Sequence, residues 1–252
     1  MSAIQKKAND EYFKAGGGPL FPGTFVSLPI SRYPSDVSSF LTYSWYRFRQ
    51  WGFEYISLLQ MKLKSMPNWT TRPKWKIARG KIAPTAKNMY MEMLGAFAAG
   101  DKAAINELCL GQFGKKLIAA IDRRNPAEVV TFELVKLNKT LVYPRVMGHQ
   151  VHNINPHDKD HSTEQAIVAI ASTQRVTKLK KATGEIIPGS TKVQDKLEYV
   201  VLSRQISEKT FQAGHWRIWG TISPTTLESF KAEEDWINRE QAKRAGWDGP
   251  TK

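Results

Sequence analysis

The feature that most constrains the fold is a change of hydrophobic period at Pro126. Before it, residues 86–99 place apolar side chains at helical spacing, and two shorter helical segments follow, one capped by Asp101 and one over 112–123. After it, apolar residues alternate with period two over 129–143, 193–206 and 215–223, and the strand predicted over 165–179 begins as a continuous apolar run, 166–171, and then turns polar. Helices followed by strands predict an α+β fold in which the helices pack on a curved, cone-like antiparallel sheet.

Two details refine the predicted sheet. The alternation of 129–143 changes phase between Leu134 and Val135, which indicates a β-bulge. Residues 148–161, GHQVHNINPHDKDH, read as a polar connection between strands because Asn, Asp and Pro favour loops. The alternative interpretation is a zinc site, since imidazoles at short spacing can bind zinc. Its histidines would be His149, His152, His157 and His161. We predict the loop, and no metal or cofactor.

The chain divides into five parts by composition. Residues 1–34, rich in Gly and Pro, predict an extended N-terminal strap, and 35–65 predict a long amphipathic, aromatic helix capped by Ser35 or Asp36. Residues 66–86 contain Pro67, Pro73 and Pro84 and predict a basic linker. The cone-like domain is expected over 87–224, and a C-terminal helix and tail over 225–252.

The aromatic helix has two possible roles. Its stripe could pack on the domain or on a neighbouring protein, as amphipathic stripes commonly do. Alternatively, the helix could lie in a membrane interface, with aromatic rings among the headgroups and basic residues at the lipid phosphates. The residues expected to make the membrane or partner contact are Trp45, Phe48, Arg49 and Trp51. No run of 18 uncharged apolar residues occurs, so no transmembrane helix is expected.

Positive charge is concentrated before the domain. The net charge is +14, and residues 1–86 carry 13 basic against 4 acidic residues. The window 55–91 holds eight basic residues and no acid, whereas a solvated helix face normally mixes both signs. Basic extended segments with aromatic residues suit RNA, although an ordinary solvated linker is the alternative. The predicted RNA-binding residues are Arg72, Lys74, Trp75, Lys76, Arg79 and Lys81, with a second patch of Lys178, Lys180, Lys181 and Lys192.

Catalytic signatures are missing from the sequence. Neither G-x-x-x-x-G-K-[ST] nor G-x-G-x-x-G occurs. The single cysteine, Cys109, lies in an apolar segment and is expected to be a buried thiol. Glu198 lies between Leu197 and Tyr199 and is expected to point away from the core, so no acid–histidine pair is predicted inside the cone. We therefore expect a protein that is not an enzyme.

The order of elements resembles that of the cone-shaped, nuclear-transport-factor-two-like superfamily. The helical stretch YMEMLGAFAAGDKAAINELC (90–109) and the strand WRIWGTI (216–222) look like the branch that contains the membrane tether of the mitochondrial import motor. That branch also holds a mitoribosomal large-subunit protein of the polypeptide exit tunnel and its fungal counterpart, the inner-membrane ribosome receptor. The Pro-rich strap, aromatic helix and basic linker are most similar to these ribosomal members.

This resemblance implies a non-catalytic component of the mitochondrial large ribosomal subunit. Its expected partners are ribosomal RNA, neighbouring large-subunit proteins, inner-membrane lipid and the membrane insertase. It would help to tether the ribosome to the matrix side of the inner membrane for co-translational insertion. The alternative is a peripheral subunit of the import motor, and a cone-pocket enzyme is a more distant alternative.

Overall fold

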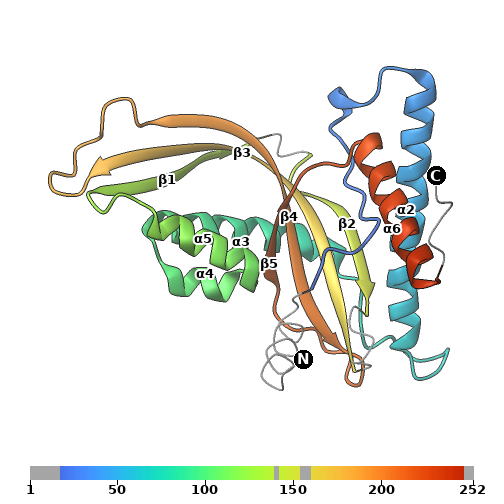
Figure 1. The fold of residues 1–252 in the computed structure, drawn as a ribbon. Coiled ribbons are helices and arrows are strands. Elements are labelled where there is room, and N and C mark those ends of the chain that lie inside the picture. Colours follow the sequence, from blue (N-terminus) through green and yellow to red (C-terminus); the bar gives the residue numbers. More distant parts are fainter. Residues whose placement is uncertain (1–17, 139–141, 154–159, 247–252) are drawn as a thin grey trace.

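The computed structural model describes residues 18–138, 142–153 and 160–246. It confirms the predicted class, because helices pack on one five-stranded antiparallel sheet (Figure 1). A short 3-10 turn, η1, covers Ile30–Arg32. The helices are α2 (Val37–Lys64), α3 (Arg79–Ala99), α4 (Lys102–Leu108), α5 (Gly111–Asp122) and α6 (Leu227–Arg244). The strands are β1 (Glu128–Leu137), β2 (Arg145–His152), β3 (His161–Lys180), β4 (Lys192–Ser207) and β5 (Arg217–Ile222).

The long strand β3 organises the sheet. On one side it pairs with β4, which pairs in turn with β5. On its other side β2 pairs with residues 163–169 and β1 with residues 172–180, so both strands share one edge of β3. The register of β1 shifts between Leu134 and Lys136, which confirms the predicted bulge. The sheet is bent along its length and curves over the helices beneath it (Figure 1).

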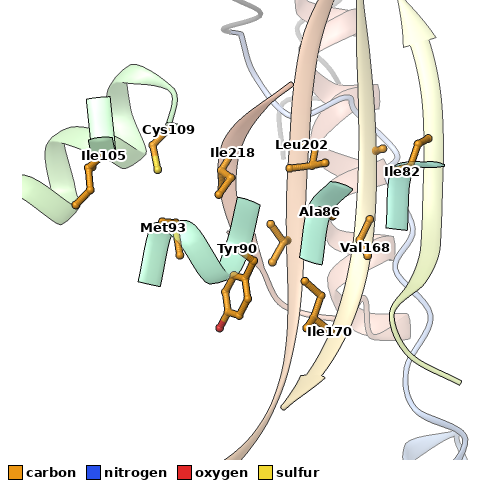
Figure 2. Close-up of a cluster of buried hydrophobic side chains, with 12 residues drawn as sticks. Ile82, Ala86, Tyr90, Met93, Ile105, Cys109, Val168, Ile170, Leu202 and Ile218 are labelled. Carbon is orange, nitrogen blue, oxygen red and sulfur yellow. The ribbon is translucent and has the colours of Figure 1, made fainter. Parts of the chain in front are cut away.

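Helices α3, α4 and α5 fill the concave face. Tyr90 and Met93 of α3 are buried against Val168 and Ile170 of β3 and Leu202 of β4 (Figure 2). Asp101 caps α4 by accepting a hydrogen bond from the Ala104 amide at 3.0 Å, as predicted. Cys109 is buried in the same cluster, which confirms the expected buried thiol. This cluster is the hydrophobic core of the domain.

The segment before α2 lies across the opposite face. Val26 packs with Ile167, Ala169 and Val201, which point away from the helices. Polar contacts fix its path, because Gln165 donates to the Pro19 carbonyl at 3.0 Å and Trp219 Nε1 donates to the Gly18 carbonyl at 2.8 Å. Both faces of the central strands are therefore covered.

The linker expected over residues 66–86 is shorter than predicted. Helix α3 begins at Arg79 and includes Pro84, although an internal proline removes one helical hydrogen bond and costs about 3 kcal/mol. Ile82 and Ala86 are 3% and 0% exposed, so burial of this first turn and a half offsets the cost. Helix propensity alone could not predict this helical turn, because its stability comes from packing against the sheet.

The polar connection expected over residues 148–161 is also corrected. Strand β2 runs to His152, and its inward side chain His149 is fully buried. The strand lacked the usual apolar alternation because a polar residue occupies the inward position and is hydrogen-bonded there. His157 lies outside the described residues. Among the residues described, no group of three His, Cys, Asp or Glu side chains could hold a metal ion.

Candidate membrane and nucleic-acid interface

The outer face of α2 is an aromatic ladder formed by Trp45, Phe48, Trp51 and Tyr55. These side chains are 61%, 61%, 53% and 55% exposed, far more than rings of this size usually are. Successive ring centroids lie 6.2, 6.0 and 6.1 Å apart, so the rings form one continuous surface. The exposed Leu41, Ile56, Leu59 and Leu63 extend this apolar surface at helical spacing.

The inner face of α2 is polar for a buried surface. Gln50, Glu54 and Ser57 are 8%, 4% and 4% exposed, beside the buried Tyr43 and Met61. Helices of globular proteins normally bury the apolar face and expose the polar one. Helix α2 has the reverse arrangement over its central turns, so its aromatic ladder is a surface without a partner in the described chain.

The buried polar groups of α2 close an edge of the sheet. Within the described residues β2 pairs with β3 alone, which leaves the amides of its other edge facing α2. Glu54 Oε2 accepts from the His149 amide at 3.3 Å, and Ser57 Oγ accepts from the Val151 amide at 3.4 Å. Covering a free edge in this way satisfies its backbone donors and blocks pairing with another chain. The ladder is therefore held rigidly on the domain.

A charged network lies just behind this contact. Glu164 Oε1 is 2.8 Å from His149 Nε2, and its Oε2 accepts from Arg204 Nε at 2.7 Å. The Arg204 guanidinium also lies 4.2 Å from the ring centroid of Trp216. Burial alone would raise the pKa of Glu164, but the hydrogen bonds from His149 and Arg204 outweigh burial and lower it. Glu164 is therefore a buried carboxylate that both partners hold.

Glu54 has the opposite electrostatic setting. Burial raises its pKa to about 7 from the ordinary 4.5, although the His149 amide and the charge of Arg79 act to lower it. Two buried carboxyl groups on either side of His149 thus have pKa values displaced in opposite directions. Glu54, with the raised pKa, lies on helix α2, and Glu164, with the lowered pKa, lies on strand β3 of the sheet.

The predicted RNA-binding segment divides into buried and exposed residues. Lys74 and Lys76 are exposed, whereas Trp75 between them is 3% exposed and packs on Leu58 and Ile206. In this conformation Trp75 cannot stack on a base, and its assignment as an RNA contact is corrected. Neighbouring side chains of an extended segment point in opposite directions, which places the lysines outward when the tryptophan points inward. Trp69 is 88% exposed and is the aromatic residue of this segment that remains free to stack.

The remaining predicted basic residues lie in separate places. Arg72, Arg79 and Lys81 are exposed, Arg72 in the segment that joins α2 to α3, and Arg79 and Lys81 in the first turn of α3. The second patch lies at the tip of the β3–β4 arm, at the other end of the molecule (Figure 1). Within that patch Lys178 pairs with Glu128 at 2.8 Å and Lys180 lies 4.0 Å from Glu185, whereas Lys181 and Lys192 are exposed. The structure does not bring the two predicted patches together.

Arg49 is engaged within the chain. Its Nη2 lies 2.5 Å from Glu234 Oε1 on α6, and its guanidinium lies 5.1 Å from the ring centroid of Tyr46. Half-exposed, it fixes α6 against α2, together with the contact between Tyr46 and Phe230. Of the four predicted contact residues, the three aromatic ones are the more available.

Three arginines converge in a hollow that the sequence did not predict, although Arg79 was among the predicted RNA-binding residues. Arg47 of α2, Arg79 of α3 and Arg145 of β2 line one hollow of about 180 Å³. Gln50, Glu54 and Ser27 are buried residues along its wall, and Trp51 of the ladder borders it. The arginines are far apart in sequence, so the chain gave no signal that would group them. Only the docking of α2 on β2 makes them neighbours.

The concave face carries a small polar cluster. Gln174 Nε2 donates to Tyr90 Oη at 2.9 Å and lies 3.2 Å from Glu198 Oε2. The prediction that Glu198 points away from the core is therefore wrong, since it shares the helix-facing side of β4 with Val200 and Leu202. Burial raises the pKa of Glu198. Its polar neighbours in the sheet, rather than an apolar environment, allow an acid on this face.

The fold and this site define a class of protein: a cone-like α+β domain to which an additional helix presents a rigid aromatic surface. Residues 81–223 match the family model described as the Tim44-like domain, and this match covers more than half of the chain. The chain belongs to the Tim44-like domain family, within the nuclear-transport-factor-two-like superfamily. Tim44-like domains are associated with the mitochondrial inner membrane. Helices α2 and α6, and with α2 the aromatic ladder, lie outside the matched residues.

Comparisons with curated proteins and with solved structures identify no further family. A search of curated proteins finds no match. Among solved structures, the chain is similar to the intermembrane-space region of the chloroplast protein ARC6, with a TM-score of 0.32 and 15% identity over 57% of this chain and 96% of that one. None of the helices in the described residues is long and apolar enough to cross a membrane.

Proposed function

We propose that this chain is a non-catalytic adaptor on the matrix side of the mitochondrial inner membrane that holds the large ribosomal subunit near its polypeptide exit tunnel. The observation that carries the proposal is the rigid aromatic ladder on α2. In this proposal the aromatic ladder inserts into the interface of an anionic membrane. Ribosomal RNA, neighbouring large-subunit proteins and the membrane insertase are the proposed partners.

The charge on α2 favours a membrane as the occupant of the ladder. Glu54 is the only acid in the helix and it is buried, so the exposed surface of α2 carries no negative charge. Its basic residues are Arg47, Arg49, Lys62 and Lys64. Tryptophan and tyrosine rings favour the headgroup region, and each basic residue near an anionic surface contributes about 1 kcal/mol. Arg49 pairs with Glu234 and Lys64 with Glu208, which leaves Arg47 and Lys62 as the cations of α2 that could meet lipid phosphates beside the apolar face.

The exposed basic segment after α2 supports the RNA contact. Arg72, Lys74 and Lys76 are exposed on a segment anchored by Trp75, and Trp69 stands free beside them. Lysine and arginine displace counterions from phosphates, and an exposed indole can stack on an unpaired base. This segment follows α2 directly, so a membrane-bound ladder and a bound ribosome would be held close together.

Co-sedimentation with purified large mitoribosomal subunits tests the ribosomal part. Replacing Arg72, Lys74 and Lys76 with Gln should weaken binding and lower the salt slope by about 3, since three phosphate contacts are lost. The matched control replaces the exposed Lys231, Arg239 and Arg244 of α6 with Gln and should retain binding. Equal binding by both triple variants and the unaltered chain would remove the RNA contact from this segment.

A second candidate function is a peripheral subunit of the protein-import motor. The family match favours this candidate, because residues 81–223 match the Tim44-like domain and the branch that the sequence resembles includes the membrane tether of the import motor. In that case the chain would bind membranes through the same ladder without binding the large ribosomal subunit. The co-sedimentation experiment above therefore separates the two candidates.

A further inference from the structure

The proposed membrane role assigns no function to the hollow lined by Arg47, Arg79 and Arg145. We propose that it binds the phosphate group of a phospholipid headgroup while the ladder lies in the membrane interface. This inference rests on the proposed membrane role, and it adds a specific lipid-binding site to a general surface attraction.

The charges of the hollow favour an anion. Within the described residues none of the three guanidinium groups has a carboxylate within 4.0 Å, and Arg47 Nη1 donates instead to Tyr33 Oη at 2.7 Å. Guanidinium groups offer paired N–H donors that match the oxygens of a phosphate. The buried acid beside them, Glu54, has a pKa raised to about 7 by burial, so at pH 7 it is about half ionised and cannot balance the three positive charges. An anion with several oxygens would satisfy all three arginines.

The size of the hollow favours a single phosphate group. Its volume is about 180 Å³, whereas sites for drug-sized ligands commonly measure about 300–1,000 Å³. A second hollow of about 330 Å³ adjoins it, and Arg47, Arg145 and Met147 line both. Tyr33, Tyr143 and Tyr199 border the second hollow and could contact the rest of a headgroup.

The position of the hollow favours a lipid over free phosphate or RNA. Trp51 of the ladder borders it, and Arg47 lies one helical turn before Trp51. Arg47, Phe48 and Trp51 also line a shallow depression on the ladder itself. If the rings lie at the boundary between headgroups and acyl chains, arginines beside them reach the level of the phosphates. Of the residues predicted to bind RNA, Arg79 lines this hollow, whereas Arg72, Lys74 and Lys76 do not border it.

Vesicle flotation with the full chain tests the site. One set of phosphatidylcholine vesicles contains phosphatidic acid, and a second set contains oleic acid at a matched surface charge. The unaltered chain should bind the first set more tightly, because phosphatidic acid presents an exposed phosphomonoester, whereas the phosphate of phosphatidylcholine, common to both sets, is esterified to choline. Replacing Arg47 and Arg145 with Gln should weaken binding to the first set about thirtyfold and abolish the preference, since each arginine near the surface is worth about fivefold. The matched control replaces the exposed Lys115 and Lys116 of α5 with Gln and should keep the preference.

Other results would overturn the proposal in identifiable ways. If the double arginine variant keeps the preference for phosphatidic acid, the hollow does not bind lipid phosphate. If inorganic phosphate binds the unaltered chain and the arginine variant still floats normally, the ligand is free phosphate. If the arginine variant instead loses only ribosome binding, the hollow contacts RNA. If the unaltered chain binds neither set of vesicles, the membrane role itself falls. If ladder variants lose vesicle binding but the arginine variant keeps it, only the phosphate site is removed.

Discussion

Glu54 on α2 accepts a hydrogen bond from the His149 amide of β2, with 3.3 Å between Oε2 and N. This contact makes α2 part of the folded domain, because the helix satisfies a backbone donor that a further strand would otherwise take. One turn later Ser57 faces the next outward amide, that of Val151, at 3.4 Å. A helix held by its polar side leaves its apolar side outward, which explains why the aromatic ladder is exposed.

Removing the Glu54 carboxyl should destabilise the domain. We expect Glu54→Ala to lower the free energy of unfolding by about 1–3 kcal/mol near pH 5, because the His149 amide is left buried without its acceptor. Glu92→Ala, at an exposed position of α3, is the control and should change stability by less than about 0.5 kcal/mol. Urea unfolding measures both variants, and equal losses would show that the edge contact contributes nothing.

The raised pKa of Glu54 predicts a dependence of stability on pH. The folded-state pKa is about 7 and the ordinary value is 4.5, so between these pH values the folded chain retains a proton that the unfolded chain has lost. The contribution of Glu54 to the free energy of unfolding therefore falls as pH rises from 4.5 to 7. Glu54→Gln keeps an acceptor oxygen without the charge, so it should be more stable than the unaltered chain at pH 8, by up to about 3 kcal/mol. Parallel stability curves for the two chains from pH 4 to pH 8 would contradict this account.

The two tryptophans after α2 should behave differently. Trp75→Ala should cost about 3–5 kcal/mol of stability because it empties a buried position, whereas Trp69→Ala should change stability by less than about 0.5 kcal/mol. Thermal unfolding compares the two. The two variants should have the opposite order of effect on binding to the large ribosomal subunit: Trp69→Ala should weaken binding more than Trp75→Ala, because the exposed Trp69 ring is the one available to stack on RNA. Equal thermal losses would place Trp69 in the core.

Cys109 should report unfolding. Burial raises the pKa of its thiol to about 12, so it should resist iodoacetamide at pH 8 while the domain is folded. Labelling followed by mass measurement should then proceed only as fast as the core opens, and denaturant should accelerate it. Rapid labelling of the native chain would mean that the region around α4 opens independently of the core.

Parts of the fold followed directly from the sequence. Helices α4 and α5, the Asp101 cap of α4 and the bulge in β1 are local patterns, and each was found where its residues predicted it. Strand β2 was missed because its inward residue is His149, which becomes compatible with burial only when Glu164 lies opposite. The start of α3 was misplaced because Ile82 gains its burial from a sheet formed much later in the chain.

The site was harder to predict for the same reason. The aromatic composition of α2 was plain, but its amphipathic pattern could not show which side the domain would cover. Burial of Gln50 and Glu54, which places the rings outside, depends on the free edge of β2. Trp75 was assigned to RNA because a basic, Pro-containing segment reads as extended and exposed, and the apolar patch that receives it comes from β2 and β4. The arginine hollow combines three distant segments and had no sequence signal.

The most direct test of the central claim is flotation of the full chain with vesicles rich in anionic phospholipid. We predict that the unaltered chain floats, and that replacing Trp45, Phe48 and Trp51 with Ser weakens binding by at least about tenfold without loss of stability, since these side chains are exposed. A control with Trp236→Ser, at an exposed position of α6, should float normally. Undiminished flotation of the triple variant would contradict the proposal that the ladder is the membrane-binding surface.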